Sequence, residues 1–293
     1  MTQRSFTIAN VELAVSGPHA LHLVDDDTIY RSFATPVGRE RLAITIEEAG
    51  TADLDGWSPV FDSGVAWRLY RSNGDRLLSF ARPHAPDAWL YSARLQGLAE
   101  RVTVHCGPRL CEVREGRATL HDPVRYPLDQ LLLMYRLAAG RGAIVHAASA
   151  AVAGRGWVFA GRSGAGKSTL MRQLAAETEL EALGDDRVIL RSIEGQIRAF
   201  GTPWPGEARV ARNVDLPLHA IAFLCQGSEH RLVRLDRREA LVRLLPVVSI
   251  PWYEPEVAAE VLDLLGALLA AVPAYDLHFA LRPGVVDLLA RHP

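Results

Sequence analysis

The chain has 293 residues, of which 49% are hydrophobic and 23% are charged. A chain of this length and composition can bury a full core and divide into about two domains. Its formal net charge of -2 at pH 7 gives no overall field that would hold a polyanion. We therefore expect a globular protein that does not bind nucleic acid.

The cysteines and the apolar stretches indicate the compartment. Cys106, Cys111 and Cys225 form an odd set without metal-ligand spacing, which favours free thiols in a reducing compartment. The N-terminus lacks the charged start and apolar segment of a secretory signal. The most apolar stretch, 257–272, contains acidic residues and is too short to span a bilayer, so it predicts a buried or half-buried helix. We expect a cytoplasmic protein with no membrane partner.

Residues 1–122 predict a strand-rich first domain. Asn73-Gly74 between two alternating runs is a strong signal for a hairpin, and Glu115-Gly116 predicts a second one. The expected strands are 41–46, 65–71, 76–80, 101–105, 110–114 and 118–120. This domain contains no catalytic motif, so we expect it to bind the substrate, bind a partner or support assembly.

The pattern changes at Asp122-Pro123, where we place the boundary to a second domain, 123–293. Residues 126–139 predict a helix with one apolar face. A small-residue apolar run follows at 143–152, and Gly154-Arg155-Gly156 predicts a turn before a buried strand at 157–160. The next helix begins with apolar residues at helical spacing, so strand, loop and helix follow one another.

The loop between that strand and that helix reads GRSGAGKST. Its glycines let the backbone aim several N–H groups at one point, and the following helix adds its positive end, so the loop suits phosphate. This is the GxxxxGKS (Walker A) pattern in its expected context, and it predicts binding of ATP or another nucleoside triphosphate with Mg2+. The Ser168 hydroxyl is the expected magnesium ligand, assisted by Thr169. The loop residues are Gly161, Arg162, Ser163, Gly164, Ala165, Gly166, Lys167, Ser168 and Thr169.

Lys167 is the only lysine among 32 lysine and arginine residues. Nucleotide bias explains the excess of arginine, but the same bias would place arginine at position 167 as well. A compact ammonium fits between the β- and γ-phosphates, whereas the wide guanidinium does not. The single lysine therefore supports a phosphate-binding role for the loop.

Carboxylates that could serve the phosphate site occur twice after the loop. Asp185 and Asp186 lie near the start of the apolar run 183–190, where a Walker B function could lie. Because neighbouring strand residues point to opposite faces, only one of the two can face the phosphate unless the chain bends. Glu207 lies on a Pro/Gly-rich loop followed by Arg209 and Arg212. This loop is either a lid with an acid for magnesium and arginines for phosphate, or an ordinary surface loop.

His146 lies in the strand before the loop strand. A histidine in an apolar strand is commonly a hydrogen-bonded core residue, but a hairpin would bring this one close to the phosphate loop. Both interpretations stay open on the sequence.

Taken together, His146-Ala147, the GRSGAGKST loop and the run GDDRV at 184–188 resemble the C-terminal catalytic domain of HPr kinase/phosphorylase and its relatives, over about 143–281. The resemblance implies an α/β (α+β) fold in which a mixed-sheet P-loop kinase domain, of the HPr kinase/phosphoenolpyruvate carboxykinase type, follows a smaller strand-rich domain. It further implies that one of Asp185 and Asp186 is the base toward an acceptor hydroxyl and that the other helps to hold magnesium. His146 would then interact with the base, and Glu207 would lie near a second metal-contacting loop.

Thr169 stands where HPr-specific members carry an acidic residue, which disfavours HPr itself as the substrate. The stretches 201–207 and 272–277 look like HPr-kinase-related proteins, some of which phosphorylate the C-terminal serine of lasso precursor peptides. The expected activity is transfer of the γ-phosphoryl group of ATP to a serine of a peptide or small protein, with homo-oligomerisation left open. Alternatives are an NTP-hydrolysing switch or assembly ATPase, and a small-molecule kinase. No LSGGQ-like or NKxD segment favours an ABC ATPase or a GTPase.

Overall fold

The computed structural model describes residues 2–17, 20–22, 27–35, 38–49, 53–82, 85–114 and 116–292. The chain divides into two compact units, Met1–Arg136 and Leu137–Pro293. Each unit combines strands with a few helices, and its sheets contain both parallel and antiparallel pairs. The expected α/β class with mixed sheets is therefore confirmed.

The first unit is rich in strands, as expected. Its elements are β1 Thr2–Ile8, β2 Val11–Gly17, β3 Ala20–His22, α1 Asp27–Arg31, β4 Glu40–Glu48, β5 Ser58–Asp62, β6 Trp67–Ser72, β7 Asp75–Arg82, β8 Ala85–Gln96, β9 Arg101–Cys106, the 3-10 turn η1 Pro108–Leu110, β10 Cys111–Arg114, β11 Arg117–His121 and α2 Leu128–Ala139. Within the described ranges, one sheet has the order β1-β2-β4-β9-β8-β7-β6-β5 and a smaller one the order β10-β11-β3. Buried residues alternate with half-buried ones along β2 and with exposed ones along β4, so these strands bury one face.

Both expected hairpins of the first unit form. Asn73 and Gly74 have φ angles of 49° and 85°, and such a left-handed pair matches the twist of the strands that it joins. Strands β10 and β11 pair up to Arg114 and Arg117, while Glu115, expected in their turn, lies outside the described residues.

The division between the units falls inside α2, downstream of the boundary that we expected at Asp122-Pro123. The first part of this helix packs with the first unit. Tyr30 donates a hydrogen bond of 2.6 Å to Asp129, and the Arg76 guanidinium lies 5.2 Å from the ring centre of Tyr135. These long-range contacts, which no composition change marks, tie α2 to α1 and β7 of the first unit.

The second unit contains a mixed sheet. Its elements are β12 Gly142–Val152, β13 Arg155–Ala160, α3 Lys167–Glu177, β14 Glu181–Gly184, β15 Arg187–Ile193, β16 Gln196–Phe200, β17 Asp215–Gln226, β18 Arg231–Arg234, α4 Arg237–Leu244, the 3-10 turn η2 Leu245–Val247, α5 Pro255–Ala271, β19 Ala274–Phe279 and α6 Val285–Arg291. The strand order is β13-β12-β15-β16-β17-β19-β18, and β14 also pairs with β12. Because β13 pairs in parallel with β17 as well, the path from β13 through β12, β15, β16 and β17 closes on itself.

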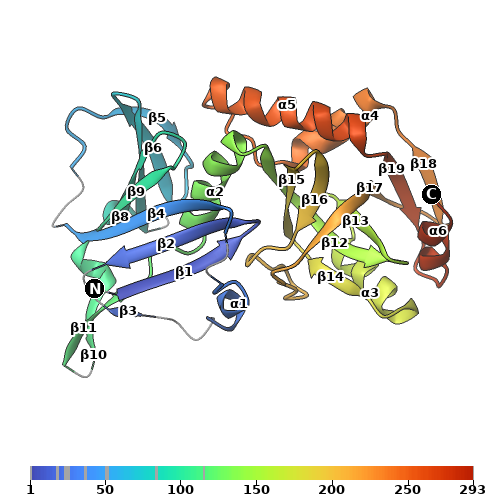
Figure 1. Ribbon diagram of the computed structural model, residues 1–293, viewed down its shortest axis with the longest axis horizontal. Helices are drawn as coiled ribbons and strands as arrows, with labels where there is room; N and C mark the ends of the chain where they lie inside the picture. Colours follow the sequence, from blue (N-terminus) through green and yellow to red (C-terminus); the bar gives the residue numbers. More distant parts are fainter. Residues whose placement is uncertain are drawn as a thin grey trace. The chain divides into compact units, whose positions relative to one another are not determined.

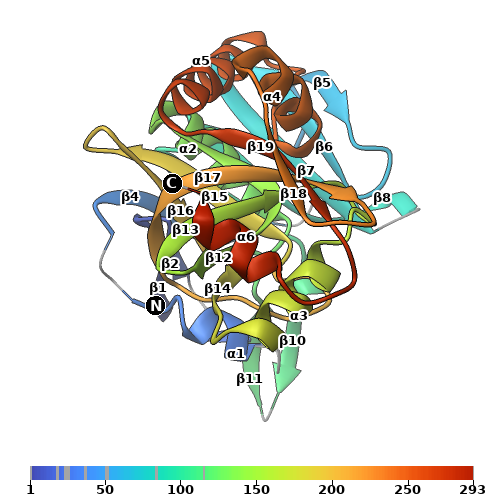
Figure 2. The same cartoon turned by 90° about the vertical axis from the view of Figure 1, so that its right-hand side faces the viewer.

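Helices cover the sheet of the second unit on both sides: α3 and α6 lie on one side, and α4 and α5 on the other (Figures 1 and 2). The core between the sheet and α3 and α6 contains Leu170 and Leu289, together with Leu277 and Phe279 of β19. Because side chains alternate along a strand, residues 276 and 278 point to the opposite side, where α4 contacts β19.

The apolar stretch 257–272 coincides with α5, which buries one face, so the expected half-buried helix is confirmed.

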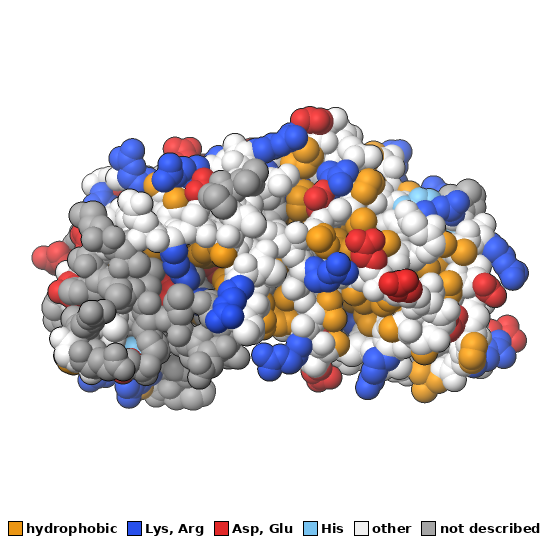
Figure 3. Space-filling model, turned by 60° about the horizontal axis from the view of Figure 1, so that its bottom comes forward, with side chains coloured by type: hydrophobic (Ala, Val, Ile, Leu, Met, Phe, Trp, Pro, Cys, Tyr) orange, Lys and Arg blue, Asp and Glu red, His pale blue; other side chains and the backbone are white. Residues whose placement is uncertain are grey.

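Within the described ranges, the helices lack the length and apolar character needed to cross a membrane. On the described surface that faces the viewer in Figure 3, acidic and basic side chains are interspersed.

The turn that leads into β13 corrects one expectation. It consists of Ala153 and Gly154, with φ angles of 49° and 73°, and the strand already begins at Arg155 rather than at Trp157. Gly156 is not a turn residue: a Cβ atom there would lie 2.3 Å from the carbonyl oxygen of Pro217. Glycine at 156 therefore permits the close pairing of β13 with β17.

Candidate functional site

The glycine loop joins the end of β13 to the start of α3. Gly164 and Gly166 have φ angles of 80° and 99°, in the left-handed region that glycine adopts without steric cost. A Cβ atom on Gly166 would also lie 3.0 Å from the ring of Phe279. Ser168 and Thr169 lie in the first turn of α3, whose free N–H groups and dipole favour an anion.

Lys167 is buried at the base of this loop, with 7% of its surface exposed. Its ammonium group donates to the carbonyl oxygens of Gly161 at 2.9 Å and Arg162 at 3.3 Å. Burial lowers the pKa of Lys167, and the charge of Asp186 acts in the opposite direction. The loop thus holds a cation among its own carbonyl groups.

Asp186 lies beside His146 because β12 and β15 pair at this point. His146 is the pairing partner of Arg187, and the Ala147 amide donates to the Asp186 carbonyl oxygen at 2.9 Å. The Asp186 Oδ1 atom is 2.9 Å from His146 Nε2, and its other carboxylate oxygen forms an ion pair with Arg187. The hydrogen bond with His146 lowers the pKa of Asp186, burial opposes this, and Arg187 lowers it further.

His146 Nε2 has two close partners. It lies 2.9 Å from Lys167 Nζ as well as 2.9 Å from Asp186 Oδ1. One ring nitrogen cannot donate to a carboxylate and accept from an ammonium at the same time. The imidazole tautomer therefore decides which of the two charged groups His146 binds.

The chain bends at Asp185 and Asp186, between β14 and β15, which is the exception that the sequence left open for the run 183–190. Both carboxylates consequently line the same pocket, which an unbent strand would not allow. Asp185 differs from its neighbour, because it is only 2% exposed. Its carboxylate accepts three backbone hydrogen bonds, from Gly206 at 2.9 Å, Ala208 at 2.7 Å and Val210 at 3.2 Å.

The segment that carries Glu207 is held in place by these bonds. Thr202 and Trp204 are buried, and the Thr202 hydroxyl donates to the Arg187 carbonyl oxygen at 2.6 Å. The segment is thus anchored to Asp185 and to the start of β15. Glu207 itself is exposed and lines the pocket.

These residues surround a pocket with a volume of about 590 Å³, within the range of small-molecule sites. Arg172 of α3 also lines it; the sequence signal was its position four residues after Ser168, which places both on one helix face. Arg187 belongs to the GDDRV motif, but the sequence predicted no role for it. The expected site residues that line the pocket are His146, Ser163, Gly164, Gly166, Lys167, Ser168, Thr169, Asp185, Asp186 and Glu207, whereas Gly161, Arg162 and Ala165 are not among the described lining residues.

Fold and site together define a mixed α/β protein in which a glycine loop with a buried lysine faces a histidine and two carboxylates. A family model described as SynChlorMet cassette protein ScmC matches residues 110–281, more than half of the chain. The chain therefore belongs to the ScmC family. The matched range contains all the candidate site residues, from His146 to Glu207. A comparison with curated proteins finds no match to this chain.

Proposed function

We propose that this protein is an ATP- and Mg2+-dependent kinase that transfers the γ-phosphoryl group to a serine hydroxyl of a peptide or small protein. The observation that carries the proposal is the convergence of Lys167, His146 and Asp186 within hydrogen-bond distance beside the glycine loop. A nucleotide-driven switch requires a site that binds the phosphates. A kinase requires in addition a base for the acceptor hydroxyl, and an ionised carboxylate paired with a histidine beside the glycine loop can supply that base.

Phosphate binding would fall to the loop and the start of α3. Their N–H groups carry partial positive charge that favours the triphosphate. Lys167 would exchange its carbonyl partners Gly161 and Arg162 for phosphate oxygens, which are stronger acceptors. Arg172, from the same helix face as Ser168, adds a second cationic group on the pocket wall.

The donor set of the pocket fits magnesium. Mg2+ prefers oxygen ligands, and the pocket presents the Ser168 hydroxyl and the carboxylates of Glu207 and Asp185. Asp185 already accepts three hydrogen bonds, which leaves about one lone pair of its carboxylate for an ion. We therefore assign the direct contacts with Mg2+ to Ser168 and Glu207. When bound, the ion would neutralise charge on the phosphate oxygens.

In the transfer step, the serine oxygen forms a bond to the γ-phosphorus while the bond from that phosphorus to the β–γ bridging oxygen breaks. ADP leaves with the electron pair, and the hydroxyl proton passes to Asp186. His146 and Arg187 orient the Asp186 carboxylate and keep it ionised, since both lower its pKa. Asp185 acts as a positioning residue that fixes the segment bearing Glu207.

Two further observations support the serine acceptor and the compartment. The residues that form the site are those whose order resembles the HPr-kinase-related proteins, in which the acceptor is a serine. The three cysteines are free, as suits a reducing compartment, and we place the reaction in the cytoplasm.

The proposal is tested by incubating the purified chain with Mg-ATP and a candidate serine peptide, ideally one encoded beside this protein. We expect ADP release that depends on the peptide, and a gain of one phosphoryl group on the peptide by mass spectrometry. A matched peptide with serine replaced by alanine should give neither. Acceptor-independent ADP release would favour the switch or assembly ATPase instead, and calorimetry that shows no uptake of Mg-nucleotide would refute both.

A further inference from the structure

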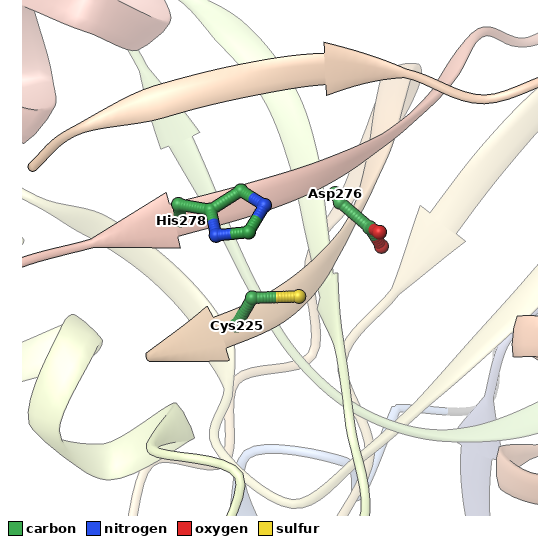
Figure 4. A group of neighbouring side chains, drawn as sticks. All are labelled: Cys225, Asp276 and His278. Atoms are coloured by element: carbon green, nitrogen blue, oxygen red, sulfur yellow. The ribbon is translucent and has the colours of Figure 1, made fainter. Parts of the chain in front are cut away.

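Three side chains with metal-binding donor atoms converge on the sheet of the second unit, on the side away from α3 and α6 (Figure 4). Strands β17 and β19 are parallel neighbours, and Cys225 is the pairing partner of His278. Asp276 precedes His278 by two residues and therefore points to the same side. The Cys225 sulfur, one carboxylate oxygen of Asp276 and one ring nitrogen of His278 all lie within 4.8 Å of one another.

Asp276 offers one oxygen to this cluster. Its Oδ2 atom accepts a hydrogen bond of 2.7 Å from Arg243 of α4. Its Oδ1 atom is buried and accepts no hydrogen bond of regular geometry among the described residues, while the Cys225 thiol interacts with the same carboxylate. A buried polar atom that lacks a full hydrogen bond destabilises the fold. This oxygen is therefore available to a ligand that the thiol can share.

We propose that Cys225, Asp276 and His278 bind a divalent cation of the zinc type. Thiolate, imidazole and carboxylate are the three ligand classes of protein-bound zinc, whereas magnesium and calcium select oxygen alone. Three protein ligands leave the fourth position to water. All three residues are partly exposed, so an ion can reach the site from solvent.

The distances are compatible with a small closure of the site. Donor atoms about 2.0–2.3 Å from a tetrahedral zinc are roughly 3.5 Å apart, compared with an upper limit of 4.8 Å here. Binding of zinc would therefore require the three side chains to rotate toward one another. Arg243 donates a hydrogen bond to the Asp276 carboxylate, as residues around a metal site commonly do to the metal ligands. The Arg243 side chain is half exposed, so water screens its positive charge.

Binding would require the thiol to lose its proton. Burial raises the pKa of the Cys225 thiol, and the nearby charge of Asp276 raises it further. The proton would be released as the sulfur–metal bond forms. Proton release is therefore a signature that separates this site from an all-oxygen site such as the one proposed at the glycine loop.

The test uses the full chain, purified without a histidine tag and stripped with a chelator, in excess Mg2+ so that oxygen sites are filled. Titration with Co2+, a spectroscopic substitute for zinc, should saturate at one equivalent and give a thiolate-to-cobalt charge-transfer band, which Zn2+ should abolish. Calorimetry with Zn2+ in buffers of different ionisation enthalpy should report proton release. Absence of the band in the unmodified chain would overturn the proposal, whatever the variants do.

Variants assign the ligands. Cys225→Ser should remove the charge-transfer band, and His278→Ala should weaken cobalt binding at least about tenfold, with folding checked by circular dichroism. Cys111→Ser is the matched control, because it removes a partly exposed thiol of the first unit and should leave the titration unchanged. A band that survives in Cys225→Ser would contradict the assignment. These measurements do not depend on the kinase activity.

Discussion

The two walls of the pocket are built in different ways. The wall formed by the glycine loop is shaped by its own backbone, through the left-handed Gly164 and Gly166 and the helix that follows. The opposite wall, which carries Glu207, is shaped by the side chain of Asp185 reaching it from a bend in the chain. The comparison teaches that the glycine loop is a local structure, whereas the wall that carries Glu207 depends on long-range hydrogen bonds, most of them to Asp185.

The largest loss should come from the loop wall. We expect Lys167→Ala to lower phosphoryl transfer by at least about 1000-fold, because it removes the buried ammonium group that we propose binds the phosphates. Stability should change little, since the ammonium contacts loop carbonyls rather than the apolar core. Steady-state kinetics and thermal unfolding measure the two effects. Lys167→Arg is the matched control and should also fail; an active arginine variant would show that charge alone suffices.

Asp186→Asn should cost about 100- to 10,000-fold in kcat, the range expected for loss of a general base. Nucleotide affinity should change far less, because the amide keeps the size of the carboxylate. Single-turnover transfer with calorimetric measurement of Mg-ATP binding separates the two. An unchanged kcat would place the base elsewhere and remove the distinction that we draw between the two aspartates.

His146→Ala should lower kcat by about 100-fold if the imidazole only assists Asp186. The hydrogen bond with His146 is the strongest influence that lowers the pKa of Asp186. Its loss should raise that pKa toward the ordinary carboxyl range, so activity should disappear at a higher pH on the acid side. A pH–rate profile shows the shift, and His146→Gln, whose amide can donate, should restore part of it. An acid limb that stays in place would separate His146 from the base.

The smallest effect on transfer, and the largest on stability, should come from the other wall. Asp185→Ala should lower the free energy of unfolding by about 2–4 kcal/mol, since it leaves backbone N–H groups without partners. Transfer should fall roughly tenfold, because Glu207 loses its position. Urea unfolding and limited proteolysis near residues 206–210 measure the first effect. If the segment stays protected in Asp185→Ala, Asp185 is not its anchor.

The sequence predicted the features that rest on neighbouring residues. The Asn73-Gly74 hairpin and the half-buried α5 follow from turn chemistry and apolar patterning, and the placement of the glycine loop between β13 and α3 follows from a local pattern. The convergence of His146 with the two aspartates was expected only through the family resemblance, and the structure supplies the β12–β15 pairing that produces it.

Contacts between distant residues were not predictable. Asp185 binds amides 21 to 25 residues away, and composition around Asp122 gave no sign that α2 would pack with the first unit. The cysteine spacing gave no metal motif, because the partners of Cys225 are Asp and His side chains on a neighbouring strand. Such sites depend on strand register, which single-sequence patterns do not determine.

The double pairing of β13 has a consequence for local opening. This strand is hydrogen-bonded to β12 on one side and to β17 on the other, inside a path of strands that closes on itself. The strand therefore cannot fray from an edge of the sheet. Its amides can exchange with solvent only when the closed ring of strands opens cooperatively. In deuterium labelling, we expect Trp157–Ala160 to rank among the slowest-exchanging amides of the chain, so that the glycine loop begins at a strand that resists local opening.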